Sequence, residues 1–181
     1  MFSIVDLEST NGDPIAGRSM ELAIVQFDGK KVTEVFSTLI QPGTPVQPYV
    51  VGLTGINDEM LVHAPIFKDI AGIVDEMTKD RILVAHNLLF DMQILRTEFA
   101  RLDIEYDRDG LCTDKLSRSV WPERLHYNLS SLCEMLSIPF NGEHRAENDA
   151  LATTKLFGHL LKETSGAIRT KSGALVEEIL A

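Results

Sequence analysis

The sequence is poor in cysteine and in long apolar runs. Its two cysteines, Cys112 and Cys133, lie in no Cys-x-x-Cys or Cys/His cluster among the 181 residues. Isolated cysteines argue against a disulfide framework or a zinc site, and we expect both as small buried side chains. No apolar run approaches the ~20 residues that a membrane helix needs, and the first residues lack a basic, cleavable signal pattern. We therefore expect a cytoplasmic protein that does not contact a membrane.

Positive charge is also scarce. Lysine and arginine number 17 against 27 aspartates and glutamates, which gives a formal net charge of −10. This balance argues against a broad basic surface that holds long nucleic acid by releasing counterions. It leaves open a nucleic-acid enzyme with local, metal-assisted contacts, acting on a short substrate end or on substrate delivered by a partner. The length and the 44% hydrophobic content are typical of one globular domain.

Apolar runs and turn signals along the chain predict an α/β fold. The first residues form a continuous apolar run of the kind found in strands covered on both faces. Asp28-Gly29 separates two later apolar runs and predicts a hairpin. The whole pattern indicates a sheet of mixed direction with helices on its faces. Strands are expected at 1–8, 20–27, 31–40, 81–85 and 111–113, and helices at 66–77, 88–100, 114–120 and 129–136, with others starting at 57 and 146.

Two carboxylates interrupt the first apolar run. In a strand, Asp6 and Glu8 point to the same side, so both would project together from its end. Crowded carboxylates at the end of a buried strand repel each other and resist desolvation. A hard divalent cation would relieve both problems. The alternative is that Asp6 and Glu8 simply begin a solvated loop.

Three more polar residues occupy notable positions in later elements. Asp91 lies in the first turn of a predicted helix, where the helix dipole alone already favours a carboxylate. Asp149 falls on the apolar face of the last clear helix, and a buried aspartate needs a partner. His144 precedes that helix on a loop, where a histidine is commonly only a surface residue. Each has an ordinary explanation, but together with the two strand carboxylates they indicate one metal-binding site.

These residues belong to three ordered motifs. Asp-x-Glu followed by small polar residues occurs at Asp6–Thr10, a second motif at His86–Asp91, and His-x-Ala-x-x-Asp at His144–Asp149. Together they resemble the DEDDh 3′–5′ exonucleases, the superfamily of the proofreading epsilon subunit of bacterial DNA polymerase III, ribonuclease T and oligoribonuclease. The segment Leu53–Ile56 is similar to the Ile-His-Gly-Ile region of the epsilon-like members, with threonine in place of histidine.

The resemblance covers about residues 2–162 and implies a fold. Its members have a ribonuclease H-like, mixed five-stranded sheet flanked by helices on both faces. We therefore expect an exonuclease domain at 1–165 and a C-terminal tail at 166–181, with a candidate short helix at Ala174–Leu180.

The resemblance also implies the chemistry. The expected enzyme is a metal-dependent 3′–5′ exonuclease that removes nucleoside 5′-monophosphates from the 3′ ends of DNA. Two divalent cations, Mg²⁺ or Mn²⁺, would be held by the four carboxylates, with Asp6 bridging both ions. His144 would act as the general base that takes a proton from the attacking water. The expected catalytic residues are Asp6, Glu8, Asp91, His144 and Asp149, and the four acidic ones are the expected metal ligands.

A single-stranded or frayed 3′ end would bind beside these residues. Leu53 and Ile56 would form an apolar platform for the terminal base, with core packing as the equal alternative for both. Thr54 and the Gly55 backbone would contact the sugar. The expected substrate-binding residues are Leu53, Thr54, Gly55, Ile56, Asn87 and Phe90.

Two other functions remain open from the sequence. The substrate could be RNA, because the contact to a 2′-hydroxyl that separates the two sugars is not visible in a sequence. The chain could instead be an inactive adaptor module with an exonuclease fold, although its intact catalytic side chains argue against this. A polymerase or a repair protein is the expected partner.

Overall fold

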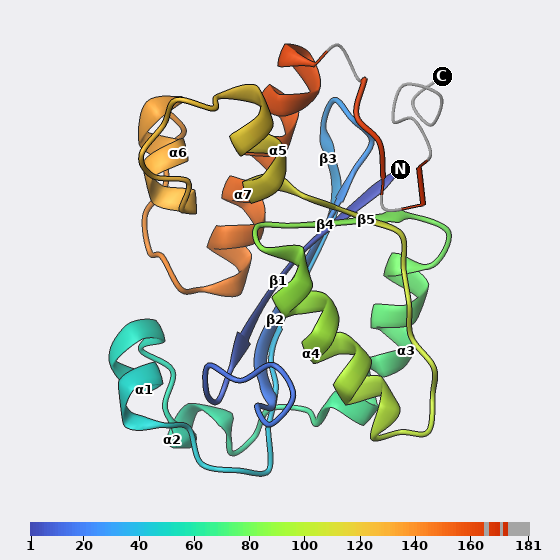
Figure 1. Cartoon of the computed structure of the whole chain (residues 1–181). Helices are drawn as coiled ribbons and strands as arrows, with labels where there is room; N and C mark the ends of the chain where they lie inside the picture. The colour runs from blue at the N-terminus through green and yellow to red at the C-terminus, as the bar shows by residue number, and fades with distance from the viewer. Residues whose placement is uncertain (165–166, 171, 174–181) are drawn as a thin grey trace.

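The structure is a computed structural model that describes residues 1–164, 167–170, 172 and 173. Its centre is a five-stranded sheet with the strand order β3-β2-β1-β4-β5 (Figure 1). β1 (Phe2–Ser9) pairs antiparallel with β2 (Ser19–Phe27), which pairs antiparallel with β3 (Val32–Leu39). β4 (Ile82–Ala85) and β5 (Gly110–Cys112) extend the other side of β1 in parallel. The mixed sheet expected from the sequence is confirmed.

β1 is the central strand, and its side chains alternate between two apolar cores. Val5 and Leu7 pack into the core on one face of the sheet, while Ile4 packs into the core on the other. Because successive side chains of a strand point to opposite faces, Asp6 and Glu8 lie on the face of Ile4. The central strand thus carries both carboxylates toward one layer of helices.

The hairpin between β2 and β3 forms around Asp28 and Gly29, as predicted. The Asp28 carboxylate accepts hydrogen bonds from the backbone N–H groups of Lys30 and Lys31, both at 2.8 Å. Gly29 has φ 95°, a left-handed conformation that glycine adopts without strain. These local bonds close the turn and place β3 at the edge of the sheet.

Helices cover both faces of the sheet. In the described part of the chain they are α1 (Pro48–Thr54), α2 (Asp58–Leu61), α3 (Phe67–Thr78), α4 (Leu88–Ala100), α5 (Thr113–Val120), α6 (Leu129–Met135) and α7 (Ala146–Glu163). α3 and α4 pack on the face of Val5 and Leu7, whereas α7 packs on the opposite face through Ala150 and Phe157. α5 and α6 pack against α7, and α1 and α2 lie at the lower edge of Figure 1, near the end of β1. Within the described residues, no helix has the length and apolar character to cross a membrane.

The core on the α7 face extends beyond the end of that helix. Ile168 is buried there and packs in the same cluster as Phe2 and Leu161. The division expected at residue 165 stays a prediction, and the candidate helix Ala174–Leu180 lies outside the described residues.

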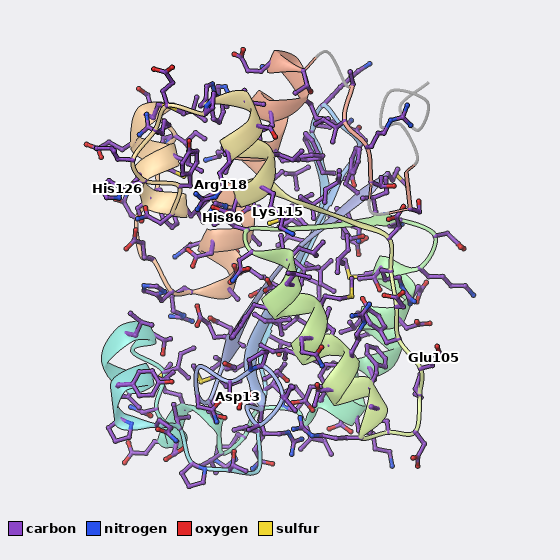
Figure 2. The ribbon with its side chains drawn as sticks, viewed as in Figure 1. Asp13, His86, Glu105, Lys115, Arg118 and His126 are labelled. Atoms are coloured by element: carbon purple, nitrogen blue, oxygen red, sulfur yellow. The ribbon has the colours of Figure 1, made fainter. Side chains whose placement is uncertain are left out.

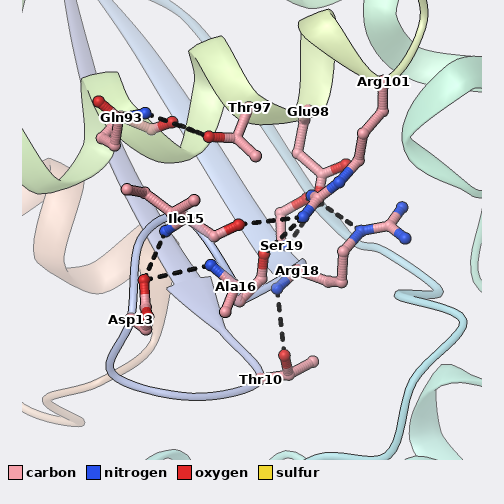
Figure 3. A network of polar contacts seen from close by, with 11 residues as sticks. Thr10, Asp13, Ile15, Ala16, Arg18, Ser19, Gln93, Thr97, Glu98 and Arg101 are labelled. Carbon is pink, nitrogen blue, oxygen red and sulfur yellow. Dashed lines mark hydrogen bonds and ion pairs between the residues drawn. The ribbon is translucent and has the colours of Figure 1, made fainter.

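A buried ion-pair network fixes the loop that follows β1 (Figure 3). Glu98 of α4 is 2% exposed and lies 3.1 Å from nitrogen atoms of both Arg18 and Arg101. It also accepts a 2.9 Å hydrogen bond from the backbone N–H of Ser19. The Thr10 hydroxyl accepts a 3.1 Å hydrogen bond from the backbone N–H of Arg18. The segment next to the end of β1 is therefore held against α4.

Candidate active site

Asp6 lies within a group of acidic side chains drawn from four elements. Burial raises the pKa of its carboxyl well above the usual range, and the charges of Asp91, Asp149, Glu8 and Glu21 raise it further. These residues belong to β1, β2, α4 and α7, which the fold brings to one place. The ionised forms of these acids are therefore disfavoured here unless a positive charge lies among them.

Glu8, His144 and Asp149 form a tighter group beside the N-terminus of α7. One ligand atom from each of the three side chains lies within 4.8 Å of the other two. Burial, followed by the Asp149 charge, raises the pKa of Glu8 to about 8. Burial also raises the pKa of Asp149 to about 6. Without a cation, Glu8 is therefore largely protonated near neutral pH.

Only one of the two oxygens of the Asp149 carboxylate has a hydrogen-bond partner among the described residues. Its Oδ2 accepts a 3.0 Å hydrogen bond from the backbone N–H of His144. Its Oδ1 is buried and has no hydrogen-bond partner among the described residues. A buried oxygen without a donor costs free energy unless a cation or a water binds it. This oxygen is therefore the atom in the group that most clearly requires a ligand.

Asp91 joins the group from the first turn of α4. It is buried, and its carboxylate accepts hydrogen bonds from the backbone N–H groups of Leu7 and of Asp91 itself. Burial still raises its pKa well above the usual range, and the Glu8 charge adds to the shift. Because Leu7 lies between Asp6 and Glu8 on β1, this contact fixes Asp91 next to both strand carboxylates.

Two hollows flank the carboxylates. A cleft of about 370 Å³ is lined by Asp6 and Asp149, and also by His144. A pocket of about 190 Å³ is lined by Glu8, together with the side chains of Leu53 and other residues. The acidic group therefore lies between two spaces that a substrate can enter.

Glu21 is a supporting residue that the sequence analysis missed. It is buried on β2, directly opposite Glu8 in the β1–β2 register. Its carboxylate accepts a 2.8 Å hydrogen bond from the Arg145 guanidinium and a 2.9 Å hydrogen bond from the backbone N–H of Ala146. These bonds tie β2 to the first residues of α7 and so hold His144 near Glu8. A glutamate within a mainly apolar, fully buried strand was the available signal.

His86 opens the second motif, but the fold itself uses both nitrogens of its ring. Nδ1 lies 2.9 Å from the Thr113 hydroxyl, and Nε2 lies 2.9 Å from the Tyr127 carbonyl oxygen. Because a carbonyl only accepts, Nε2 carries the proton and Nδ1 accepts. Burial lowers the pKa of the imidazole, which favours this neutral form. The ring therefore joins the loop after β4 to α5 and to the segment before α6, in the region where Figure 2 labels His86 and Arg118.

Comparison with known proteins places this arrangement in a family. Residues 3–157 match the family model RNase_T, described as an exonuclease. The chain belongs to the exonuclease family. This exonuclease chain is 33% identical over 163 residues to DNA polymerase III subunit epsilon of Aquifex aeolicus, a match that covers 90% of this chain and 81% of that protein. It is 32% identical over 156 residues to the 3′-5′ exonuclease DinG of Staphylococcus epidermidis, covering 86% of this chain but only 17% of that protein.

Solved structures agree with the family. Exonuclease X in complex with 5′ overhanging duplex DNA matches with a TM-score of 0.76 at 25% identity, over 100% of both chains. The nuclease domain of 3′hExo, a DEDDh family member bound to rAMP, matches with a TM-score of 0.81 over 96% of both chains. At 16% identity, this second likeness shows the fold alone. The ribonuclease H-like fold and membership of the DEDDh 3′–5′ exonucleases are confirmed.

The exonuclease structure corrects part of the expected substrate site. Ile56 is 0% exposed and packs in a core cluster with Val50, so the platform prediction is wrong for Ile56 and the core alternative is right. Thr54 is buried as well, and its hydroxyl donates to the Val50 carbonyl and accepts from the Ile56 N–H, both at 3.0 Å. Its side chain is therefore not available to a sugar. The reason is that residues 48–54 form α1, a helix that the sequence analysis did not predict, and this helix turns Thr54 inward.

Of the other expected substrate residues, two line the small pocket and two are exposed without lining it. Leu53 is 52% exposed and lines the pocket together with Phe90. Gly55 ends α1 with φ 73°, and Asn87 is exposed at the start of α4 with φ 75°. Substrate binding by these residues stays a prediction.

The donor set of this exonuclease fits hard divalent cations. Carboxylate oxygens are the ligands that Mg²⁺ and Mn²⁺ prefer in proteins. A cation would satisfy the partnerless Asp149 Oδ1 and would relieve the repulsion that raises the pKa values of the acidic group. The site therefore supports the divalent-metal dependence of the family.

Proposed function

We propose that this exonuclease removes nucleoside 5′-monophosphates one at a time from the 3′ ends of DNA. The main observation behind the proposal is that carboxylates from β1, α4 and α7 meet at the end of β1, where Asp149 Oδ1 has no protein partner within the described residues. DNA is favoured over RNA because the epsilon relative, matched over most of its length, is a DNA polymerase subunit. The neighbour bound to rAMP supports only the fold.

Asp6, Glu8, Asp91 and Asp149 are the residues that would hold two Mg²⁺ or Mn²⁺ ions. When bound, the cations lower the pKa of the attacking water and stabilise the charge on the leaving 3′ oxygen. Because burial and neighbouring charges raise the pKa values of Asp6 and Glu8, protons compete with cations for these carboxylates, and cation binding should strengthen as the pH rises.

His144 is the proposed general base. Its ring lies at the rim of the cleft beside Glu8 and Asp149, and an imidazole near neutral pH can take a proton from water. The backbone bond to Asp149 and the neighbouring Arg145–Glu21 pair hold the residue in place. The acidic net charge of −10 suits a partner, a polymerase or a repair protein, that delivers the strand end. A cytoplasmic location stays a prediction from the sequence.

The test is digestion of 5′-labelled single-stranded DNA and RNA of one sequence with Mg²⁺, Mn²⁺ or EDTA. We expect a metal-dependent ladder that shortens from the 3′ end, with DNA degraded faster. Asp6→Ala should lower the rate by about three orders of magnitude, and His144→Ala by about 10²–10⁴-fold. Glu105→Gln removes a carboxylate well away from His86 in Figure 2 and serves as the matched control. Intact strands under every metal would refute the proposal and favour the adaptor module.

A further inference from the structure

Tyr49 joins α1 to the loop after β1, beside the pocket that contains Glu8. Its side chain is 56% exposed, and its phenol oxygen accepts a 2.5 Å hydrogen bond from the backbone N–H of Gly12. A second bond joins the same segments, from the Gln47 N–H to the Thr10 carbonyl at 3.0 Å. A Cβ at position 12 would lie 3.2 Å from the phenol oxygen, so the glycine permits this close approach. The phenol is thereby fixed in the wall of the pocket.

The pocket is small and has both apolar and polar walls. Its volume of about 190 Å³ is below that of typical ligand sites, which suits part of a single nucleotide. Leu53 lies one helical turn after Tyr49 on the same face of α1, and Phe90 of α4 adds a second apolar side chain. Glu8 and the phenol provide polar groups in the same lining. A base packed on the apolar side would leave its sugar near the polar side.

The phenol has a donor that the fold does not use. A tyrosine hydroxyl can donate one hydrogen bond as well as accept. Within the described residues, the Gly12 N–H is its hydrogen-bond partner, and that contact uses only an acceptor position. We propose that Tyr49 donates a hydrogen bond to a sugar hydroxyl of the 3′-terminal nucleotide and so selects strand ends that carry this hydroxyl. The inference rests on the proposed function and adds a specificity residue that the motifs do not contain.

The test compares kcat/KM for oligonucleotides that differ only in the terminal nucleotide, which is deoxy, 2′,3′-dideoxy or ribo. A neutral hydrogen bond to the terminal sugar contributes a factor of roughly 3–10 to kcat/KM. If the 3′-hydroxyl accepts, the wild type prefers the deoxy end over the dideoxy end by this factor, and Tyr49→Phe removes the preference. If the 2′-hydroxyl accepts, Tyr49→Phe instead lowers the ratio of kcat/KM for the ribo end to kcat/KM for the deoxy end. Tyr106→Phe is the matched control, because that phenol donates to Thr78 in the core.

The ratios separate this role from a purely structural one. If Tyr49 only anchors the Gly12 loop, Tyr49→Phe lowers all three rates by the same factor, which overturns the inference, as do three unchanged rates. Calorimetric binding of deoxyadenosine and dideoxyadenosine 5′-monophosphates with Mn²⁺ gives a second measurement, with the same loss of discrimination expected if the 3′-hydroxyl accepts. A wild type that cleaves no end refutes the proposed function and this inference together. Unchanged ratios in an active enzyme refute this inference alone.

Discussion

Two regions of this exonuclease bury carboxylates in opposite ways. Between α4 and the start of β2, Glu98 is surrounded by donors, with Arg18 and Arg101 at 3.1 Å and the Ser19 N–H at 2.9 Å (Figure 3). At the end of β1, four carboxylates lie close together, and in the described part of the chain no lysine or arginine forms an ion pair with any of them. Their pKa values are raised by burial and by one another.

The difference separates acids that hold the fold together from acids that are available for chemistry. A buried charge is normally paired, and a carboxylate that already has its counter-charge has little to offer a cation. Glu21 makes the distinction sharp, because it lies opposite Glu8 in the sheet yet is paired with Arg145. Neighbouring glutamates on adjacent strands therefore have different roles.

The largest expected effect on stability is at the paired region. Glu98→Ala leaves Arg18 and Arg101 without their shared partner, and removing one member of a buried pair costs about 3–5 kcal/mol. Since both arginines are about 30% exposed, we expect the lower end of that range and a melting temperature about 6–12 °C lower. Calorimetry in EDTA measures this fall in melting temperature, with Glu105→Gln as the surface control. An unchanged melting temperature would show that this network does not stabilise the fold.

A smaller effect should come from cations and pH at the unpaired region. The folded pKa values of about 8 for Glu8 and about 6 for Asp149 exceed their ordinary values of 4.5 and 3.8. Their contribution to stability is therefore complete below about pH 4 and is lost as the pH rises toward 8. In EDTA the melting temperature should fall over this range, and a cation at a hundred times its Kd should restore about 2.7 kcal/mol. Glu8→Gln should reduce this decline in melting temperature with pH. A wild type whose melting temperature at pH 8 does not respond to the metal would contradict the metal site.

The smallest effect is a gain. Asp6→Asn removes one of the mutually repelling carboxylates, so in EDTA at pH 8 we expect the variant to be about 1 kcal/mol more stable than the wild type, while its response to Mn²⁺ is lost. Asp75→Asn is the matched control, because Asp75 pairs with Arg108 and the same change there should not stabilise. Thermal unfolding of both variants with and without MnCl₂ decides the point. A destabilised Asp6→Asn with a normal metal response would remove the distinction between the two regions.

Much of the fold was predictable because its elements are encoded over short stretches. The apolar stripe that predicts a helix at 88–100 corresponds to α4 (Leu88–Ala100), and the Asp28-Gly29 turn closes its hairpin through bonds to the next residues. In the candidate site, the motifs named Glu8, His144 and Asp149, and the structure brings ligand atoms of all three together. Periodicity and motif order were sufficient in these places.

The substrate side of the site was less predictable. Thr54 and Leu53 are adjacent in sequence, yet one is buried and the other is 52% exposed, because α1 docks through one face only. Ile56 was equally consistent with a platform and with the core, and only its packing in a core cluster with Met20 decided the matter. The contact between Tyr49 and Gly12 joins segments 37 residues apart and has no sequence signal.

By itself, the sequence determined which chemical groups are present, in what order, and which short segments become strands or helices. Tertiary structure alone decided which of the two glutamates facing each other on β1 and β2 is paired. Glu21 and Arg145 meet across 124 residues, whereas Glu8, opposite Glu21 in the register, has no such ion pair. The physical reason is that the pairing of Glu21 follows from strand register and helix docking, which depend on the whole core and not on any local pattern.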